Sequence, residues 1–294
     1  MTPSNAPVDP KNLEQLQGWV GRTESRNDEI RAAPMRALAA TLDRDDAQTG
    51  DGSVLHPLWH WLFFLPIDAH SKIGPDGHPR RGDFLPPIPL PRRMWAGSRI
   101  TWENGNPLRV GNTIRRDSRI LSVDHKSGRA GDLVFVAVQH DIHNATGLAL
   151  SETQNIVYRD AARSGDPVST PMAAGIDAPW QREMTPDEVL LFRYSALTFN
   201  SHRIHFDRPY ATDVEGYPGL VVHGPLLATL LLDLVYRNNP AAPIQTLDIR
   251  AVRPSFAGQP IRMNGRPATD EHAASLWAQD HQDNLTMRAE VQFA

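Results

Sequence analysis

The chain has 294 residues, of which 40 % are hydrophobic and 22 % are charged, a composition typical of an ordinary globular protein of one or two domains. Its formal net charge of -4 provides no general attraction for nucleic acid or for an anionic membrane, so we expect neither as a partner. The chain contains no cysteine, which excludes disulfides, thiolate nucleophiles and cysteine-ligated metal centres. Residues 1–10 are polar and rich in proline rather than signal-like, and the longest apolar stretch, 226–235, is far shorter than the ~20 residues of a membrane span. The expected location is therefore the cytoplasm.

The N-terminal half is predicted to begin with helices and to continue with antiparallel strands. Hydrophobic spacing favours a helix at residues 13–20 and an amphipathic helix at 28–42. An aromatic block at 58–65 and a loop dense in glycine and proline at 74–91 follow. Beyond this loop, alternating apolar residues predict three strands, at 113–124, 133–144 and 149–159.

A second unit of similar design is predicted in the C-terminal half. Residues 161–186, rich in alanine, proline, glycine and aspartate, are the expected linker between domains at 1–160 and 187–294. The second domain is expected to contain a strand at 189–195, an apolar helix at 225–236 and four further strands, at 246–254, 261–266, 275–280 and 286–293. An apolar helix beside a curved antiparallel sheet in each half indicates an α+β fold built from a duplicated unit.

The polar segment before the C-terminal helix carries the best candidates for chemistry. Asn200 and His205 are five residues apart, which on a straight helix would turn them ~140° away from each other, so the segment must bend if both contact one ligand. His205 can act as a general acid or base near neutral pH, whereas Asn200 can only donate or accept hydrogen bonds and so orient water or a carbonyl group. An exposed polar loop with incidental histidines is the alternative interpretation.

The start of the predicted C-terminal helix adds a site for negative charge. Pro225 suits the first position of a helix, and Gly224 permits a close approach of the backbone. Free N–H groups and the positive end of the helix dipole can receive the developing oxygen anion of a thioester enolate here. The alternative is a core helix that the glycine and proline merely begin, and the two interpretations are compatible.

Other motifs give weaker indications. The aromatic run that contains Trp61 either lines an acyl or nucleotide pocket or only packs. The pair Arg92-Arg93 either binds phosphates or lies on a solvated face. Histidines on the predicted strands point to different faces and form no three-ligand pattern, so we expect no metal site. Motifs for dinucleotide binding, phosphate loops and serine hydrolysis are missing, so these activities have no sequence support.

Several segments resemble one family of hydratases. Residues 200–211, with His205, and the downstream pair His223-Gly224 resemble the hydratase-2 motif of MaoC-like hotdog-fold enoyl-CoA hydratases. Five more segments are similar to the double-hotdog branch that contains mesaconyl-C4-CoA hydratases, itaconyl-CoA hydratases and hydroxyacyl-thioester dehydratases of type 2. These segments are Trp59-His60-Trp61, Asp76-Gly77-His78-Pro79, Phe84-Leu85-Pro86-Pro87, Pro89-Leu90-Pro91-Arg92-Arg93-Met94-Trp95 and Ile156-Val157-Tyr158-Arg159. The resemblance covers nearly the whole chain, from Leu13 onward.

The resemblance implies a double hotdog fold with a catalytic C-terminal half and a degenerate N-terminal half that contributes to an acyl-CoA tunnel. It also implies a homodimer that needs no metal or redox cofactor. In the water-binding dyad of the motif, the histidine corresponds to His205 and the aspartate to Asn200, so this chain lacks the carboxylate. The oxyanion glycine corresponds to Gly224, and His202 stands at the asparagine of the motif. Residues expected to bind the substrate are His202, Arg203, Arg193, His223, Arg93 and Trp61.

The expected function is reversible hydration of an acyl-CoA thioester, namely a branched C5 dicarboxylic enoyl-CoA such as mesaconyl-C4-CoA or itaconyl-CoA, which gives citramalyl-CoA. His205 is expected to be the base and proton donor, Asn200 to orient the water, and the Gly224 N–H to stabilise the enolate. The alternatives are a dehydratase of monocarboxylic 3-hydroxyacyl thioesters and a non-catalytic acyl-CoA-binding subunit. A buried arginine near His205 would favour the dicarboxylic substrate, and a long apolar tunnel would favour the fatty-acyl one.

Overall fold

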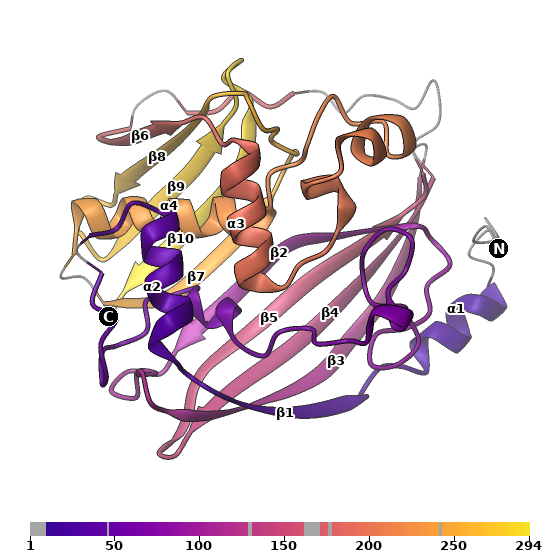
Figure 1. Ribbon diagram of the computed structural model, residues 1–294, viewed down its shortest axis with the longest axis horizontal. Coiled ribbons are helices and arrows are strands. Elements are labelled where there is room, and N and C mark those ends of the chain that lie inside the picture. The colour runs from indigo at the N-terminus through magenta and orange to yellow at the C-terminus, as the bar shows by residue number, and fades with distance from the viewer. Residues whose placement is uncertain (1–9, 46, 129–130, 162–170, 176–177, 241–242) are drawn as a thin grey trace.

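The protein forms one continuous antiparallel sheet with helices gathered against it (Figure 1). The computed structural model describes residues 10–45, 47–128, 131–161, 171–175, 178–240 and 243–294. Among these residues, the strands follow the order β1-β3-β4-β5-β2-β7-β10-β9-β8-β6. Their bounds are Thr23–Glu29 (β1), Arg92–Trp102 (β2), Thr113–Gly128 (β3), Gly131–Asn144 (β4), Gly147–Arg159 (β5), Trp180–Met184 (β6), Ile244–Ala251 (β7), Ile261–Pro267 (β8), Ala273–Gln279 (β9) and Leu285–Phe293 (β10).

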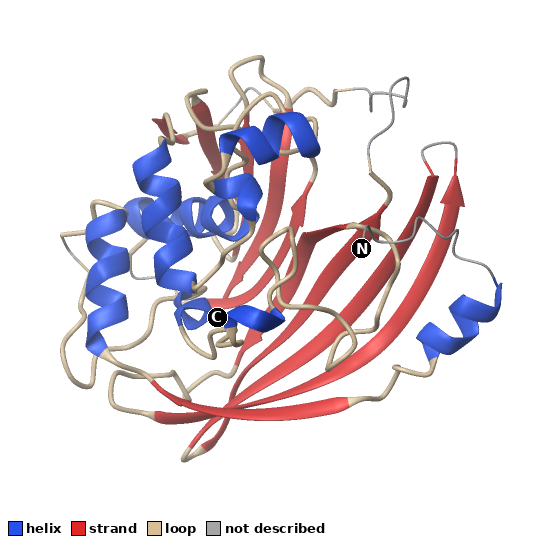
Figure 2. Cartoon of the chain, turned by 45° about the vertical axis from the view of Figure 1, so that its right-hand side comes forward, coloured by secondary structure: helices blue, strands red, loops and turns tan. Residues whose placement is uncertain are grey.

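Strand β2 joins the two halves of the sheet. It pairs with β5 of the N-terminal half along one edge and with β7 of the C-terminal half along the other, so that Ile100 lies between Glu152 and Leu247. Strands β1 to β5 and β6 to β10 therefore make a single curved surface, as twisted strands do when they pair in series (Figure 2). This arrangement confirms the prediction of an α+β fold with antiparallel strands.

Helix α4 (Gly224–Asn238) is the buried helix of the C-terminal half. All residues at 226–235 are buried, and the helix contacts β6, β8 and β9. Its aspartate, Asp233, is 3 % exposed and pairs at 2.5 to 2.6 Å with three arginines, Arg44, Arg182 and Arg237. Because a buried carboxylate without a partner would cost about 3–5 kcal/mol, these arginines explain how a charged residue interrupts the apolar sequence. They also connect α4 to β6 and to the segment that follows α2.

The other helices cover different parts of the sheet. Helix α2 (Ala32–Thr41) packs against α3 (Glu188–Thr198), so the two halves also meet through helices (Figure 1). Helix α1 (Pro10–Gln17) stands apart beside β3, where its Leu16 joins a second apolar cluster of the N-terminal sheet. Short helical turns occur at Trp59–Leu62, His70–Lys72, Arg203–His205 and Tyr210–Val214.

Most of the predicted elements are confirmed, with exceptions in the N-terminal half. The predicted strands at 113–124, 133–144 and 149–159 are β3, β4 and β5, those of the C-terminal half are β7 to β10, and the predicted apolar helix is α4. The sequence predicts neither β1 nor β2. The helix expected at 28–42 begins only at Ala32, because the preceding residues form β1 and pair with β3.

The strand predicted at 189–195 is wrong, because this segment is helix α3. Asp187 caps the helix by accepting a hydrogen bond from the Leu190 N–H at 2.8 Å, and Glu188 places a negative charge in the first turn. The buried residues Leu191, Tyr194 and Ser195 are spaced by three and four, which is helical spacing. The apolar residues of this segment therefore follow the period of a helix and not that of a strand.

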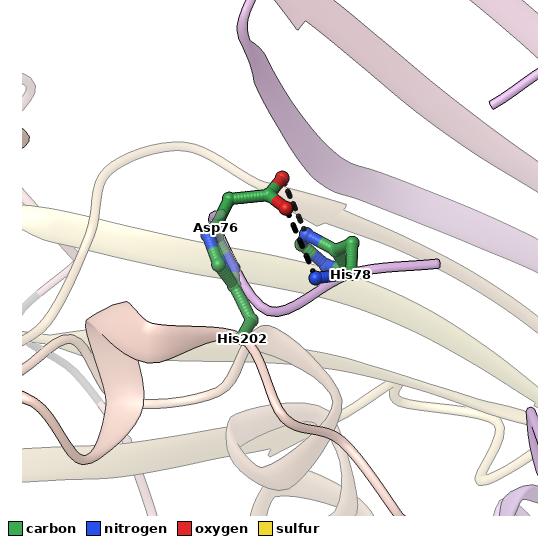
Figure 3. A group of neighbouring side chains, drawn as sticks. All are labelled: Asp76, His78 and His202. Carbon is green, nitrogen blue, oxygen red and sulfur yellow. Dashed lines mark hydrogen bonds and ion pairs between the residues drawn. The ribbon is translucent and has the colours of Figure 1, made fainter. Parts of the chain in front are cut away.

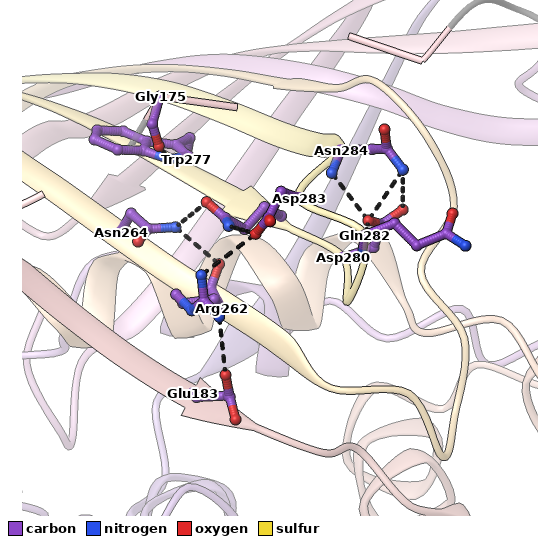
Figure 4. Close-up of polar contacts among 10 residues, drawn as sticks. Gly175, Glu183, Arg262, Asn264, Trp277, Asp280, Gln282, Asp283 and Asn284 are labelled. Carbon is purple, nitrogen blue, oxygen red and sulfur yellow. Dashed lines mark hydrogen bonds and ion pairs between the residues drawn. The ribbon is translucent and has the colours of Figure 1, made fainter. Parts of the chain in front are cut away.

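The predicted linker at 161–186 contains ordered structure near its end. Strand β6 pairs with β8 there, Arg262 of β8 contacts Glu183 at 3.4 Å, and the Trp277 indole N–H donates to the Gly175 carbonyl at 3.1 Å (Figure 4). Residues 162–170 and 176–177 of the predicted linker lie outside the described residues. The sheet of the C-terminal half therefore includes residues before 187, and the domain bounds stay a prediction.

Candidate active site

The segment after α3 bends, as Asn200 and His205 require if they are to share a ligand. Helix α3 ends at Phe199, whose backbone is left-handed with φ 49°, and the Asn200 N–H donates back to the Ser195 carbonyl at 2.9 Å. The chain then makes a single 3-10 turn, Arg203–His205. Asn200 Oδ1 accepts a hydrogen bond from the backbone N–H of His202 at 3.0 Å, so the amide acts on its surroundings through its NH2 group.

His205 is held as a neutral base. Its ring is 7 % exposed, and Nδ1 lies 2.7 Å from the Val221 carbonyl oxygen. Because a carbonyl oxygen can only accept, Nδ1 carries the proton and Nε2 is left with its lone pair. Burial lowers the pKa of His205 to about 4, although the bond to Val221 opposes the shift. At neutral pH the imidazole is therefore ready to take a proton.

His223 supports the ring of His205. The two imidazoles stack with their centroids 3.6 Å apart and their planes at 19°. His223 is 1 % exposed, precedes the first turn of α4, and shares a 2.8 Å hydrogen bond between its Nε2 and the Ser195 hydroxyl on α3. The stack thus places the neutral base His205 beside the N-terminus of α4.

Gly224 lies in direct contact with an aromatic ring from the other half of the protein. A Cβ atom at this position would lie 2.7 Å from Cε3 and 3.1 Å from Cζ3 of Trp95 on β2. Only glycine lets the indole pack against the first turn of α4, with Pro225 next in the helix as predicted. The free N–H groups at this helix end remain available to a negative oxygen.

A cavity of about 750 Å³ is lined by residues of both halves. Cavities of this size hold small ligands and cofactors. Residues that line it include Trp61, His78, Arg93, Trp95, Asn200 and Pro225. His205 and His223 are not among its lining residues. Tyr194 does line the cavity, and the centroid of its ring lies 5.1 Å from that of His223. The cavity therefore borders the histidine stack through Asn200 and Tyr194.

The residues expected to bind the substrate have different positions. Arg93 and Trp61 line the cavity. His202 is buried, and the centroid of its ring lies 4.0 Å from that of His78 and 5.4 Å from that of His205. Arg203 is paired with Asp207 at 2.7 Å and lies over the ring of Tyr210. Arg193 is exposed on α3 and is not among the lining residues, because the segment is a helix and not the predicted strand.

A loop of the N-terminal half docks on the site segment through its backbone. Gly77, at φ +91°, approaches the Ser201 carbonyl so closely that an added Cβ would lie 1.8 Å from the oxygen. The Ser201 hydroxyl donates to the Gly77 carbonyl, and the Arg203 N–H donates to the Asp76 carbonyl at 2.9 Å. This loop brings His78 to the cavity wall. Sequence analysis gave these residues no role, because a contact between positions 77 and 201 leaves no local signal.

Asp76, His78 and His202 form a compact polar cluster (Figure 3). Asp76 accepts two hydrogen bonds from His78, at 3.0 Å from the backbone N–H and 3.2 Å from Nδ1. Burial, followed by the charge of Arg93, lowers the pKa of His78 to about 4. One potential ligand atom from each residue lies within 4.8 Å of the others, so these three could hold a metal ion as far as the described residues show. The nearby guanidinium charges of Arg93 and Arg81 disfavour a cation there.

A second polar network holds the tryptophans of the cavity. Glu152 on β5 is 3 % exposed and accepts hydrogen bonds from the Trp61 indole and His60, each at 3.1 Å, and from the Ser98 hydroxyl at 2.6 Å. The Trp95 indole in turn donates to the Ser98 hydroxyl at 3.1 Å. Burial would raise the pKa of Glu152, but the hydrogen bond and charge of His60 lower it to about 2. A buried carboxylate therefore fixes the ring that packs on Gly224, a role that no sequence motif predicts.

A neutral buried histidine, a helix N-terminus and a cavity thus lie between two parts of one antiparallel sheet, an arrangement suited to an enzyme that polarises a carbonyl group. The family model for hydroxyacyl-thioester dehydratase type 2 (Htd2) matches residues 58–257, and the chain belongs to this family. The family resemblance found in the sequence is thereby confirmed.

Two relatives refine the comparison. The chain is 47 % identical over 255 residues to a mesaconyl-C(4)-CoA hydratase of Chloroflexus aurantiacus, which covers 86 % of this chain and 89 % of the relative. It is 27 % identical over 266 residues to the mitochondrial hydroxyacyl-thioester dehydratase type 2 of Schizosaccharomyces pombe, and the match covers 80 % of this chain and 87 % of the relative. The first relative is named a hydratase and the second a dehydratase.

Solved structures support the fold. A MaoC-like dehydratase superposes with a TM-score of 0.65 at 14 % identity, over 95 % of this chain and 100 % of the other. A Mycobacterium tuberculosis protein described as having a double hotdog fold superposes with a TM-score of 0.61 at 13 % identity, over 96 % of this chain and 97 % of the other. The predicted double hotdog fold is therefore confirmed. Within the described residues, no helix has both the length and the apolar character needed to cross a membrane.

Proposed function

We propose that the protein catalyses the reversible hydration of a branched C5 dicarboxylic enoyl-CoA, such as mesaconyl-C4-CoA or itaconyl-CoA, to citramalyl-CoA. The observation that carries this proposal is the neutral, buried imidazole of His205, with Nδ1 fixed by Val221, beside the helix start at Gly224. The similarity to a mesaconyl-C(4)-CoA hydratase supports the choice of substrate class.

His205, Gly224 and Asn200 have complementary roles in the proposed reaction. Nε2 of His205 takes a proton from water as the water oxygen bonds to the β-carbon of the substrate. The electrons of the double bond move to the thioester carbonyl oxygen, which the Gly224 N–H stabilises as an enolate. The enolate collapses as His205 returns its proton to the α-carbon, so one water is added and the histidine is neutral again. The NH2 group of Asn200 orients the oxygen of the water or of the β-hydroxyl product.

Arg93 is the best candidate to bind the free carboxylate of a dicarboxylic substrate. It lines the cavity from β2 and forms no ion pair with a carboxylate of the described chain. Its charge lowers the pKa of both His78 and His202, so the guanidinium lies near the histidine cluster. Arg203 is already paired with Asp207, and Arg193 is exposed on α3, which favours Arg93 over these two arginines as the residue that binds the carboxylate.

A screen of enoyl-CoA thioesters tests the proposal. Purified protein is mixed with mesaconyl-C4-, mesaconyl-C1-, itaconyl- and crotonyl-CoA, and the hydrated product is measured by liquid chromatography. Loss of the conjugated thioester absorbance is a second readout for the substrates whose double bond is conjugated with the thioester. Faster turnover of mesaconyl-C4- or itaconyl-CoA supports the proposal, whereas preference for crotonyl-CoA or longer chains would favour the monocarboxylic dehydratase. Inactivity on all four would favour a non-catalytic acyl-CoA-binding subunit.

The assembly and location of the protein also remain predictions. We propose a homodimer in the cytoplasm that binds neither metal nor redox cofactor. Light scattering on the purified protein measures the assembly, since a homodimer has twice the 32.7 kDa mass of the chain. Fractionation of the source cells tests the compartment.

A further inference from the structure

The proposed site lacks the strong acceptor that a carboxylate would offer to the attacking water. A water molecule that is to attack in a fixed orientation needs an acceptor for each of its two O–H groups. Nε2 of His205 provides one. The dyad of the family would provide the other through a carboxylate, but Asn200 stands there, and one lone pair of its Oδ1 already accepts from the His202 N–H at 3.0 Å. The remaining lone pair of a neutral amide is a weaker acceptor than a carboxylate, so another residue is the better candidate for the second acceptor.

His78 has the properties that this acceptor needs. It lines the same cavity as Asn200, on a loop whose neighbouring glycine touches Ser201. Because the Asp76 carboxylate accepts from Nδ1 of His78 at 3.2 Å, Nε2 is the nitrogen with the lone pair (Figure 3). The ring belongs to the same histidine cluster as His205, since its centroid lies 4.0 Å from that of His202, and the His202 centroid lies 5.4 Å from that of His205.

The imidazole of His78 is not needed to dock its loop. Three hydrogen bonds to backbone carbonyls hold the loop. The Arg203 N–H donates to the Asp76 carbonyl, and the Ser201 hydroxyl donates to the Gly77 carbonyl. Within the loop, the Gly74 N–H donates to the His78 carbonyl at 2.7 Å. None of these contacts uses the imidazole ring. The His78 ring also packs against His202, with the centroids 4.0 Å apart, but this contact needs neither Nε2 nor the bond from Nδ1 to Asp76.

We propose that His78, oriented by Asp76, is a second catalytic histidine that accepts a hydrogen bond from the attacking water in place of the carboxylate missing at Asn200. The inference rests on the proposed hydration. One O–H of the water gives its proton to His205, while the other is held by Nε2 of His78 and stays with the oxygen as the β-hydroxyl. In the reverse reaction, His78 holds the departing hydroxyl group. Asp76 is a positioning residue that fixes the tautomer of His78.

Restoring the carboxylate distinguishes this role from a structural one. The turnover of mesaconyl-C4-CoA is measured for the wild type, His78→Ala, Asn200→Asp and the double variant. We expect His78→Ala to lower kcat by ~100-fold with little change in KM, as for loss of an acid–base or water-holding group. Asn200→Asp in the His78→Ala protein should recover about tenfold, because the aspartate supplies the missing acceptor. Asp76→Asn should lower kcat less than His78→Ala.

Controls separate folding and metal effects from the proposed role. His125→Ala removes the histidine of another histidine–aspartate pair, 2.9 Å from Asp132 and not among the cavity-lining residues, and should leave kcat unchanged. If His78→Ala fails to fold by circular dichroism, His78→Asn with and without Asn200→Asp gives the same comparison. Unchanged kcat in the His78 variants, no recovery in the double variant, or loss of wild-type activity in EDTA with recovery on zinc would overturn the inference. A wild type inactive on every thioester would overturn the proposed function itself.

Discussion

Replacing Gly224 by alanine should impair catalysis through a tryptophan from the other half of the protein. Gly224 is not among the glycines with positive φ, so an alanine can adopt its backbone conformation. The added Cβ, however, would lie 2.7 Å from Cε3 of Trp95, whereas carbon atoms in ordinary contact are ~3.5–4.0 Å apart. The indole must therefore move by roughly 0.8 Å or more, or the first turn of α4 must move instead.

The expected cost follows from what holds the tryptophan. The Trp95 indole donates to Ser98 at 3.1 Å, and Ser98 donates to the buried Glu152 at 2.6 Å, so the ring cannot move without disturbing a buried carboxylate. Overpacking of this kind costs about 1–3 kcal/mol of stability. Displacement of the Gly224 N–H from the enolate oxygen should lower kcat by ~100-fold, as for loss of one oxyanion-hole donor.

Steady-state kinetics and urea unfolding measure the two effects of Gly224→Ala. The matched control is Gly219→Ala, whose Cβ would lie 3.5 Å from the end of the flexible Arg208 side chain, an ordinary contact. Adding Trp95→Leu to Gly224→Ala should recover stability, because the smaller side chain leaves room for the methyl group. Full kcat in Gly224→Ala, or equal losses in the Gly219→Ala control, would refute the reasoning.

Three further predictions concern buried charges and histidines. Burial lowers the pKa of His205 from 6.5 to about 4 in the folded state, so the unfolded chain binds more protons than the folded chain below pH 6.5. His205 alone should therefore reduce the free energy of unfolding by about 2 kcal/mol between pH 7 and pH 5. Urea unfolding should show a loss of stability between pH 7 and pH 5 that is larger in the wild type than in His205→Gln by this amount, because buried histidines such as His78 and His140 give both proteins a slope. Wild-type kcat/KM should stay flat down to about pH 5. Glu152→Gln should lower the free energy of unfolding by about 1–3 kcal/mol, since an amide cannot accept from all its present donors; unchanged stability would contradict the network. Arg93→Gln should raise KM for mesaconyl-C4-CoA roughly tenfold or more and leave crotonyl-CoA unaffected, whereas Arg193→Gln should change neither.

The sequence predicts the elements that carry strong local patterns. Helix α4 is apolar nearly throughout and starts with a Gly-Pro pair, and β4 contains an apolar run rich in valine in which every second residue is buried, so both are visible in the sequence. β1 is a polar strand of the sheet edge, and β2 mixes arginines with a register shift between Trp95 and Gly97, so neither gives an alternating pattern. Pairing with neighbours, not local sequence, defines these two strands.

The site shows the same division between local and long-range information. The sequence predicts roles for His205 and Gly224 because their motif lies in one short segment, and this segment contains the turn of His205 and the start of α4. His78 and Glu152 come from the N-terminal half and reach the cavity only through tertiary contacts. Arg93 was proposed as a substrate-binding residue, but only its place in the cavity separates it from Arg203 and Arg193.

The rate of hydration of mesaconyl-C4-CoA by wild type and by His205→Ala tests the central claim most directly. Loss of the conjugated thioester absorbance gives kcat and KM for both proteins, with circular dichroism to show that the variant is folded. The account predicts turnover by the wild type and a loss of ~100-fold or more in kcat for His205→Ala, because the variant has no base to take the proton from water. Near wild-type turnover by the folded variant would contradict it.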